Sequence, residues 1–153
     1  MTTSFLDGYL PYLLRQADQT LSEPFYAVLN RYGVARSEWR VLAVLHDLGD
    51  LGVVDLAAAS LSPQPTVTHA LRRLENRDLV TRRPGTHDKR QRIISITPSG
   101  ARLTATLIDE ATALQREALA EVGGLSALSQ QLRALTEAVE ARTQTPQTTQ
   151  RAG

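Results

Sequence analysis

The chain has 153 residues, a formal net charge of +1, no cysteine and a hydrophobic fraction of 42%. This length suits one domain with a substantial core, and the lack of cysteine excludes disulfides, thiol redox sensing and cysteine-based metal sites. The sequence has no basic start followed by a long apolar run, and no stretch of about eighteen apolar residues, so we expect a cytoplasmic protein without a membrane partner.

The first half of the chain shows helical periodicity. Apolar residues recur at helical spacing over roughly residues 10–32, and Pro24 predicts a kink or a restart there because it lacks an N–H. Ser37 is a suitable N-cap for the apolar helix "EWRVLAVLHDL" that follows. The stretch "LGDLG" is too short and too acidic for a phosphate loop and is interpreted as a turn, and "VVDLAAAS" predicts a short helix of about two turns.

The segment "LSPQPTVTHALRRLENRD" predicts the next helix, with Ser62 as the cap and Pro63 at the first position. A rotation of about 100° per residue separates its residues into two flanks. One flank is apolar: Val67, Ala70, Leu71 and Leu74. The other carries short polar groups, guanidinium groups and an imidazole: Pro65, Thr68, His69, Arg72, Arg73 and Asn76. Such a helix is either a DNA-reading surface or a solvated amphipathic helix.

Two β-like runs, "LVTRR" and "RIISIT", predict a hairpin whose loop is strongly basic. Residues 82–92, "RRPGTHDKRQR", hold five basic residues and one acidic residue. Between Thr66 and Arg102 nine basic and three acidic residues give a net charge of +6, whereas eight basic and thirteen acidic residues elsewhere give −5. This asymmetry is typical of a local polyanion site, and the alternative is a solvated charged hairpin.

The C-terminal part predicts two further helices and a tail. Thr97-Pro98 opens a long helix with an apolar stripe reaching Val122, Gly123-Gly124 ends it, and Ser126 caps a last helix. We therefore expect a mainly α fold with a small two- or three-stranded β wing, a winged helix-turn-helix. The expected organisation is one domain over residues 1–142, in which residues 34–97 form the DNA-binding lobe, residues 5–33 and 98–142 form dimerisation helices, and residues 143–153 are a disordered tail. The long apolar stripes of the dimerisation helices predict a homodimer.

Three of these stretches together resemble the MarR (multiple antibiotic resistance regulator) family of transcription factors, over roughly residues 10–142. "SEWRVLAVL" resembles the helix that leads into the DNA-reading motif, and "PTVTHALRRLENRDLVTRR" the recognition helix with the first wing strand. "HDKRQRIISITPSG" is similar to the family's wing, with its hallmark residues at Asp88, Arg90, Ile96, Thr97 and Gly100. The chain departs from the pattern at Asp78, where the family usually has Gly in a left-handed backbone.

The resemblance implies double-stranded DNA as the partner. It implies that Arg90 enters a minor groove, that Asp88 braces the wing tip, and that nearby arginines, Arg82 among them, lie close to phosphates. On the recognition helix, polar side chains would face bases and Arg73 would pair with phosphate. The expected DNA contacts are Gln64, Pro65, Thr66, Thr68, His69, Arg72, Arg73, Arg83, Asp88, Lys89, Arg90 and Arg92.

All seven aromatic residues fall within residues 5–39. In the resembling family a ligand site lies between the dimer-forming helices and the DNA-binding lobe, which suggests a cradle for an aromatic anion here. Its candidate residues are Tyr12, Arg15, Tyr26, Trp39 and Arg40. The alternative is that the rings pack the core and the subunit interface.

No motif for an enzyme is present: the phosphate-loop, dinucleotide-binding, zinc-protease and nucleophile-elbow patterns are all missing, and the three histidines lack metal-ligand spacing. We expect no cofactor and no metal. The resemblance implies a ligand-responsive repressor that a small aromatic acid, or an aromatic acyl thioester, releases from a palindromic operator. The alternatives are a ligand-independent architectural DNA-binding protein and a winged-helix protein-interaction module.

Overall fold

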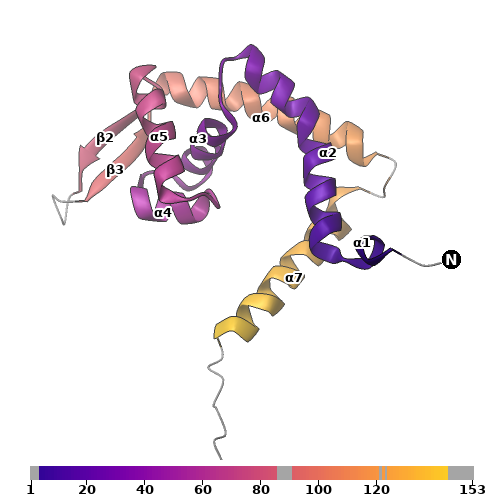
Figure 1. Ribbon diagram of the computed structural model, residues 1–153. Coiled ribbons are helices and arrows are strands. Elements are labelled where there is room, and N and C mark those ends of the chain that lie inside the picture. The colour runs from indigo at the N-terminus through magenta and orange to yellow at the C-terminus, as the bar shows by residue number, and fades with distance from the viewer. Residues whose placement is uncertain (1–3, 86–90, 121, 123, 145–153) are drawn as a thin grey trace, which may run out of the picture. The chain divides into compact units, whose positions relative to one another are not determined.

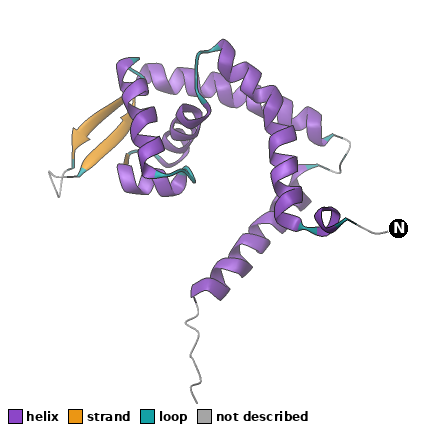
Figure 2. Ribbon diagram, viewed as in Figure 1, coloured by secondary structure: helices purple, strands orange, loops and turns teal. Residues whose placement is uncertain are grey.

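The computed structural model describes residues 4–85, 91–120, 122 and 124–144. The chain divides into two compact units, Met1–Leu114 and Gln115–Gly153. Within the described ranges, no helix combines the length and the apolar character needed to cross a membrane. Helices and a small antiparallel sheet make up the structure (Figures 1 and 2).

The first unit begins with α1 (Phe5–Gly8) and α2 (Leu10–Arg31). α2 runs through Pro24 without a break, so the predicted restart is wrong. An interior proline costs a helix about 3 kcal/mol. The turn that follows offsets this cost, because Phe25, Val28 and Leu29 are buried in one apolar cluster, and each buried side chain of this size stabilises by about 1.5–3 kcal/mol.

The helix-turn-helix consists of α4 (Val53–Ala59) and α5 (Gln64–Asn76), and α3 (Arg36–Leu48) leads into it. The predicted caps at Ser37 and Ser62 are both wrong. α3 starts earlier because the Glu38 carboxylate accepts a hydrogen bond from the Ala35 N–H at 2.7 Å. α5 starts at Gln64 with Pro63 as its cap residue, while the Ser62 hydroxyl donates to the Ser60 carbonyl at 3.0 Å.

The predicted hairpin is confirmed as β2 (Val80–Pro84) and β3 (Arg92–Ile96), paired antiparallel with Val80 opposite Ile96 and Pro84 opposite Arg92. The interpretation of "LGDLG" as a turn is wrong in part. Its last two residues form β1 (Leu51–Gly52), which pairs with the other edge of β3 and gives the sheet order β1-β3-β2. β3 offers a second row of unpaired backbone groups there, which β1 satisfies. The expected mainly α winged helix-turn-helix is thus confirmed.

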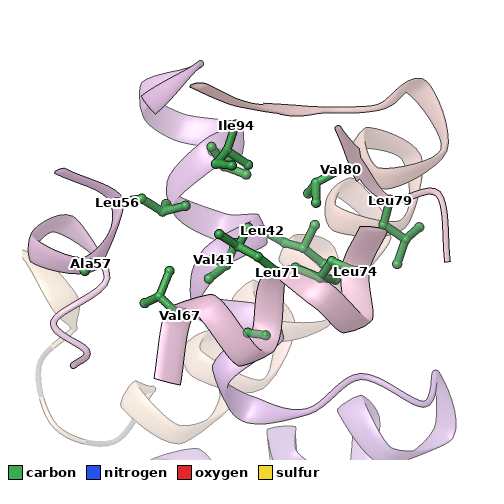
Figure 3. Close-up of a cluster of buried hydrophobic side chains, with 12 residues drawn as sticks. Val41, Leu42, Leu56, Ala57, Val67, Leu71, Leu74, Leu79, Val80 and Ile94 are labelled. Atoms are coloured by element: carbon green, nitrogen blue, oxygen red, sulfur yellow. The ribbon is translucent and has the colours of Figure 1, made fainter. Parts of the chain in front are cut away.

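The main core joins α3, α4, α5 and the sheet (Figure 3). The predicted apolar flank of α5 is its centre, since Val67, Ala70, Leu71 and Leu74 are all buried. They meet Val41, Leu42 and Leu45 of α3, Leu56 and Ala57 of α4, and Leu79, Val80 and Ile94. The helical spacing of the α5 residues fixes which side of this helix faces away from the core.

The sheet and the start of α6 (Pro98–Leu119) pack closely against each other. Asp78 has the left-handed φ of 53° that its place in the family pattern implies. Its carbonyl accepts a hydrogen bond from the Thr97 hydroxyl at 2.7 Å, and that hydroxyl accepts one from the Gly100 N–H at 2.9 Å. A Cβ on Gly100 would lie 2.0 Å from the Leu79 carbonyl oxygen, so only glycine fits this close approach.

α6 packs residues of its stretch up to Leu114 against the end of α2 in a second apolar cluster centred on Leu29 and Leu107. α6 ends at Leu119, short of the predicted glycine pair, and Val122 therefore lies beyond the helix. Tighter turn bonds take over there: the Ala120 N–H donates to the Glu117 carbonyl and the Val122 N–H to the Leu119 carbonyl, each at 3.3 Å.

The second unit contains the end of α6 and α7 (Leu125–Gln144). α7 starts one residue before the predicted cap Ser126, whose carbonyl instead accepts from the Ser129 hydroxyl at 3.0 Å. The helix continues two residues past the expected boundary at 142, and the remainder of the predicted tail lies outside the described residues. Its apolar stripe is exposed: Leu125, Leu128, Leu132, Leu135 and Val139. The single-domain boundary itself stays a prediction.

Candidate nucleic-acid interface

The outer flank of α5 presents most of the predicted base-reading residues on one surface. Gln64, Pro65, Thr68, His69 and Arg72 line a shared surface depression. Thr66 is exposed beside it. The helix starts at Gln64, so these side chains except Arg72 belong to its first two turns, the part of a recognition helix that meets base edges in a major groove, and Arg72 follows in the third turn.

The two neighbouring arginines of α5 have different surroundings. Arg72 is exposed and forms no ion pair within the described part of the chain. Arg73, in contrast, places its Nε 2.7 Å from the Oε1 atom of Glu38, whose side chain is fully buried. Arg72 therefore keeps its guanidinium available for a bidentate contact to guanine, whereas the Nε of Arg73 is already engaged.

The arginines of β2 form ion pairs on both sides of the strand. Arg82 donates from Nε and Nη2 to the two carboxylate oxygens of Glu75 on α5, at 3.0 and 3.1 Å. Arg83 pairs with Asp50 next to β1 and donates from Nε to the Ser95 hydroxyl at 3.3 Å. Hydrogen bonds from Arg83 and then from Ser95 hold the pKa of the Asp50 carboxyl below its usual value.

These ion pairs leave the wing and α5 with less free positive charge than the sequence count predicts. Asp50 and Glu38 lie outside the basic segment counted in the sequence, yet they neutralise arginines inside it. Arg92 is exposed on β3 opposite Pro84. The predicted wing-tip residues Asp88, Lys89 and Arg90 lie outside the described residues. A recognition helix with a cationic, partly braced ribbon beside it suits duplex DNA.

A separate cavity of about 430 Å³ lies in the first unit between α2 and α3. It brings together three of the five predicted ligand residues, Arg15, Tyr26 and Arg40. Its further lining residues are Asp18, Gln19, Glu23 and Arg36. Tyr12 lies in a neighbouring depression that shares Arg15.

Trp39 departs from the expected ligand cradle. Its ring packs edge-on against Phe25, with centroids 5.0 Å apart at 67°, at the margin of the second apolar cluster. The alternative interpretation, a core ring, describes this residue better. The sequence-based set also missed Arg36, whose guanidinium lies 3.5 Å from the centroid of the Tyr26 ring. Arg36 precedes Arg40 by one helical turn, so the i, i+4 spacing on α3 could have revealed it.

Comparisons with known proteins agree with this geometry. The family model for the MarR family matches residues 34–91. The chain is 31% identical to the HTH-type transcriptional regulator FarR of Neisseria gonorrhoeae over 97 residues, which cover 63% of this chain and 66% of that protein. It is also 31% identical to the transcriptional regulator HosA of Escherichia coli O157:H7 over 99 residues, 65% of this chain and 71% of that one.

Solved structures show the same fold over most of the chain. The MarR family transcriptional regulator SPO1453 from Silicibacter pomeroyi matches with a TM-score of 0.78 and 31% identity, over 90% of this chain and 99% of that chain. NadR in complex with 4-hydroxyphenylacetate matches with a TM-score of 0.73 and 25% identity, over 95% and 100% of the two chains.

A third structure, described as showing how 6-hydroxynicotinic acid regulates DNA binding by Bordetella bronchiseptica BpsR, matches with a TM-score of 0.71 and 26% identity, over 83% of this chain and 98% of that chain. The relatives are transcriptional regulators and not enzymes. Taken with the helix-turn-helix and its basic wing, these matches show that the chain belongs to the MarR family and is a DNA-binding transcriptional regulator.

Proposed function

We propose that this regulator is a homodimeric repressor that a small aromatic acid releases from a palindromic operator. The observation that carries the proposal is the cavity between α2 and α3, in which Arg36 lies over the Tyr26 ring and the lining holds three arginines against two carboxylates, Asp18 and Glu23. A guanidinium group binds a carboxylate in bidentate fashion, and an aromatic ring adds stacking and apolar area. The volume, about 430 Å³, lies in the usual range for small-ligand sites.

Arg36 gives the cavity a specific way to respond. Its guanidinium lies over the Tyr26 ring, 3.5 Å from the centroid. A ligand ring that stacks on Tyr26 displaces Arg36, and the ligand carboxylate then offers that arginine a new partner. The acids associated with NadR and BpsR, 4-hydroxyphenylacetate and 6-hydroxynicotinic acid, both combine an aromatic ring with an acid group. Tyr12 would extend the site through Arg15 for a larger ligand such as an acyl thioester.

For DNA, we assign the base contacts to the outer flank of α5: Gln64, Pro65, Thr66, Thr68, His69 and Arg72. We assign phosphate contacts to Arg83 and Arg92. The Arg83 side chain pairs with Asp50 through Nη2 and is 52% exposed. Asp88, Lys89 and Arg90 belong to the proposed set on the sequence pattern alone. Each phosphate neutralised steepens the dependence of log K on log salt by about 0.9.

The homodimer is supported by apolar surface that each unit leaves exposed. On α2 the exposed side chains include Leu10, Leu13, Leu14 and Leu21. On α7 they include Leu128, Leu132, Leu135 and Val139. A second copy that covers such stripes forms a twofold interface, because the same surface on each protomer meets its counterpart. Two recognition helices related in this way fit half-sites about 34–36 Å apart.

The test combines DNA selection with a ligand panel. Purified protein selects genomic fragments, and anisotropy then measures affinity for a selected duplex with 4-hydroxyphenylacetate, 6-hydroxynicotinate, an aromatic acyl thioester and the uncharged methyl esters of both acids. We expect at least one acid to weaken binding and its ester to do so much less. Arg40→Ala should remove this response, whereas Arg31→Ala, at a residue outside the cavity that pairs with Glu110, should keep it.

Tight, specific binding that is indifferent to every compound would favour the alternative, a ligand-independent architectural protein. Transcription in vitro from a promoter that carries the selected site decides the direction of control. A repressor lowers the transcript, and the active acid restores it. A rise in transcript on protein addition would contradict the repressor assignment.

A further inference from the structure

Glu38 is a fully buried carboxylate in the first turn of α3, beside the recognition helix. Its Oε2 accepts the Ala35 N–H at 2.7 Å, and its Oε1 lies 2.7 Å from the Nε of Arg73. Burial of a charge is costly unless the group is paired and hydrogen-bonded. The Ala35 hydrogen bond holds the carboxylate at the start of α3, and the ion pair with Arg73 holds it to α5, while the Oε1 atom itself has no hydrogen-bond partner among the described residues.

Arg77, the C-cap residue of α5, adds a second attachment four residues after Arg73. Its Nη1 donates to the Gly33 carbonyl at 2.7 Å and lies 3.9 Å from the Glu38 carboxylate, and its Nη2 donates to the Tyr32 carbonyl at 3.2 Å. Both carbonyls follow the last turn of α2, where backbone acceptors lack partners within the helix. The end of α2, the start of α3 and one side of α5 are therefore held at a single point.

Arg73 lies in the last turn of α5 and Arg77 is the C-cap residue four positions on, so the two lie near one side of the end of the helix, whereas Arg72 is offset by about 100° around the axis. A helix that is attached at two points on one side resists rotation about its axis. Rotation of α5 would move every side chain that we expect to contact bases. The buried apolar flank sets which side of α5 faces the core, and the two charged attachments add directional contacts that further restrain rotation about the helix axis.

We propose that Glu38 is a positioning residue for DNA recognition, which fixes the orientation of α5 through Arg73 and Arg77. Arg73 thereby supports the recognition helix and leaves the phosphate contacts to the wing, in contrast to its expected role. This inference rests on the DNA-binding function of the chain and is independent of the aromatic-acid ligand.

The experiment uses the full chain and two duplexes of equal length, a selected fragment and a random sequence. Glu38→Gln keeps the shape of the side chain and removes its charge. We expect it to lower the ratio of specific to random-duplex affinity at least tenfold, while affinity for the random duplex changes less than threefold. Leu107→Ala, in the second apolar cluster, serves as the control for reduced stability and should keep the wild-type ratio when assayed well below its melting temperature.

The salt dependence on the random duplex provides a second readout that needs no operator. Arg73→Ala should leave the slope of log K against log salt unchanged, whereas Arg92→Ala should flatten it by about 0.9 for each phosphate that the variant no longer neutralises. If Glu38→Gln does not fold, the double variant Glu38→Gln, Arg73→Gln removes both charges together and should show the same fall in the ratio. A wild-type ratio in the folded variant, or a flattened slope for Arg73→Ala, would overturn the proposal.

Discussion

The close approach at Gly100 gives a sharp prediction about stability. In Gly100→Ala the new Cβ would lie 2.0 Å from the Leu79 carbonyl oxygen and 2.9 Å from Cγ1 of Ile96, and the first of these neighbours is backbone. Carbon and oxygen normally stay about 3.3 Å apart or more, so α6 must move away from the residue before β2 by more than an ångström. That movement also strains the hydrogen bond between the Gly100 N–H and the Thr97 hydroxyl.

Two effects oppose each other in this variant. Alanine in place of glycine within a helix stabilises by about 1 kcal/mol. Overpacking costs about 1–3 kcal/mol or more, and the loss of a hydrogen bond costs about 1 kcal/mol. We therefore expect a net loss of about 1–3 kcal/mol, which corresponds to a fall in melting temperature of about 2–12 °C for a chain of this length.

Thermal and urea unfolding followed by circular dichroism measure this loss. Gly8→Ala is the matched control, because Gly8 is also helical and a Cβ there meets nothing within 4 Å. The control should be neutral or slightly stabilised. Equal stability of Gly100→Ala and the wild type would refute the packing argument.

Three further predictions follow from single residues. Asp78→Gly should stabilise the protein by about 1 kcal/mol in urea unfolding, because glycine adopts the left-handed backbone at φ 53° without strain. The hydrogen bond from Arg83 lowers the pKa of the Asp50 carboxyl in the folded protein. The pair therefore stabilises the fold above the unfolded pKa of about 3.9, and this stability is lost as the pH falls through the folded pKa. The pair is exposed, so this contribution is at most about 1 kcal/mol, and the stability difference between wild type and Asp50→Asn should shrink between pH 5 and pH 3. Leu132→Arg on the exposed stripe of α7 should shift sedimentation from dimer to monomer; an unchanged dimer would exclude that stripe from the interface.

The sequence predicted well those features that local periodicity determines. The buried and exposed flanks of α5 follow from the spacing of Val67, Ala70, Leu71 and Leu74, and the hairpin follows from two β-branched runs around a turn. The position of Asp78 in the family pattern predicted its left-handed backbone. These features depend on residues that are close in the chain.

Features that depend on tertiary contacts were missed or placed wrongly. A serine cap stabilises by about 1 kcal/mol, so a competing contact can shift a helix start, as the Glu38 carboxylate does at α3. The pair between Arg83 and Asp50 joins residues 33 positions apart, and no spacing rule finds such a partner. Pro24 lies inside α2 because packing of the following turn outweighs a local preference. Trp39 packs against the second apolar cluster for a similar reason, since its ring contacts Phe25 of the neighbouring helix.

The central claim is that the outer flank of α5 and the wing bind duplex DNA in each protomer of a twofold-symmetric dimer. Affinity for a selected duplex, measured across a salt series, tests it most directly. Two wing arginines on each protomer predict a slope of log K against log salt of about −3.6 or steeper, and Arg72→Ala should lose about 1–3 kcal/mol of discrimination at one base pair of each half-site. Absence of a complex at low salt, or an affinity that salt and Arg72→Ala both leave unchanged, would contradict the account.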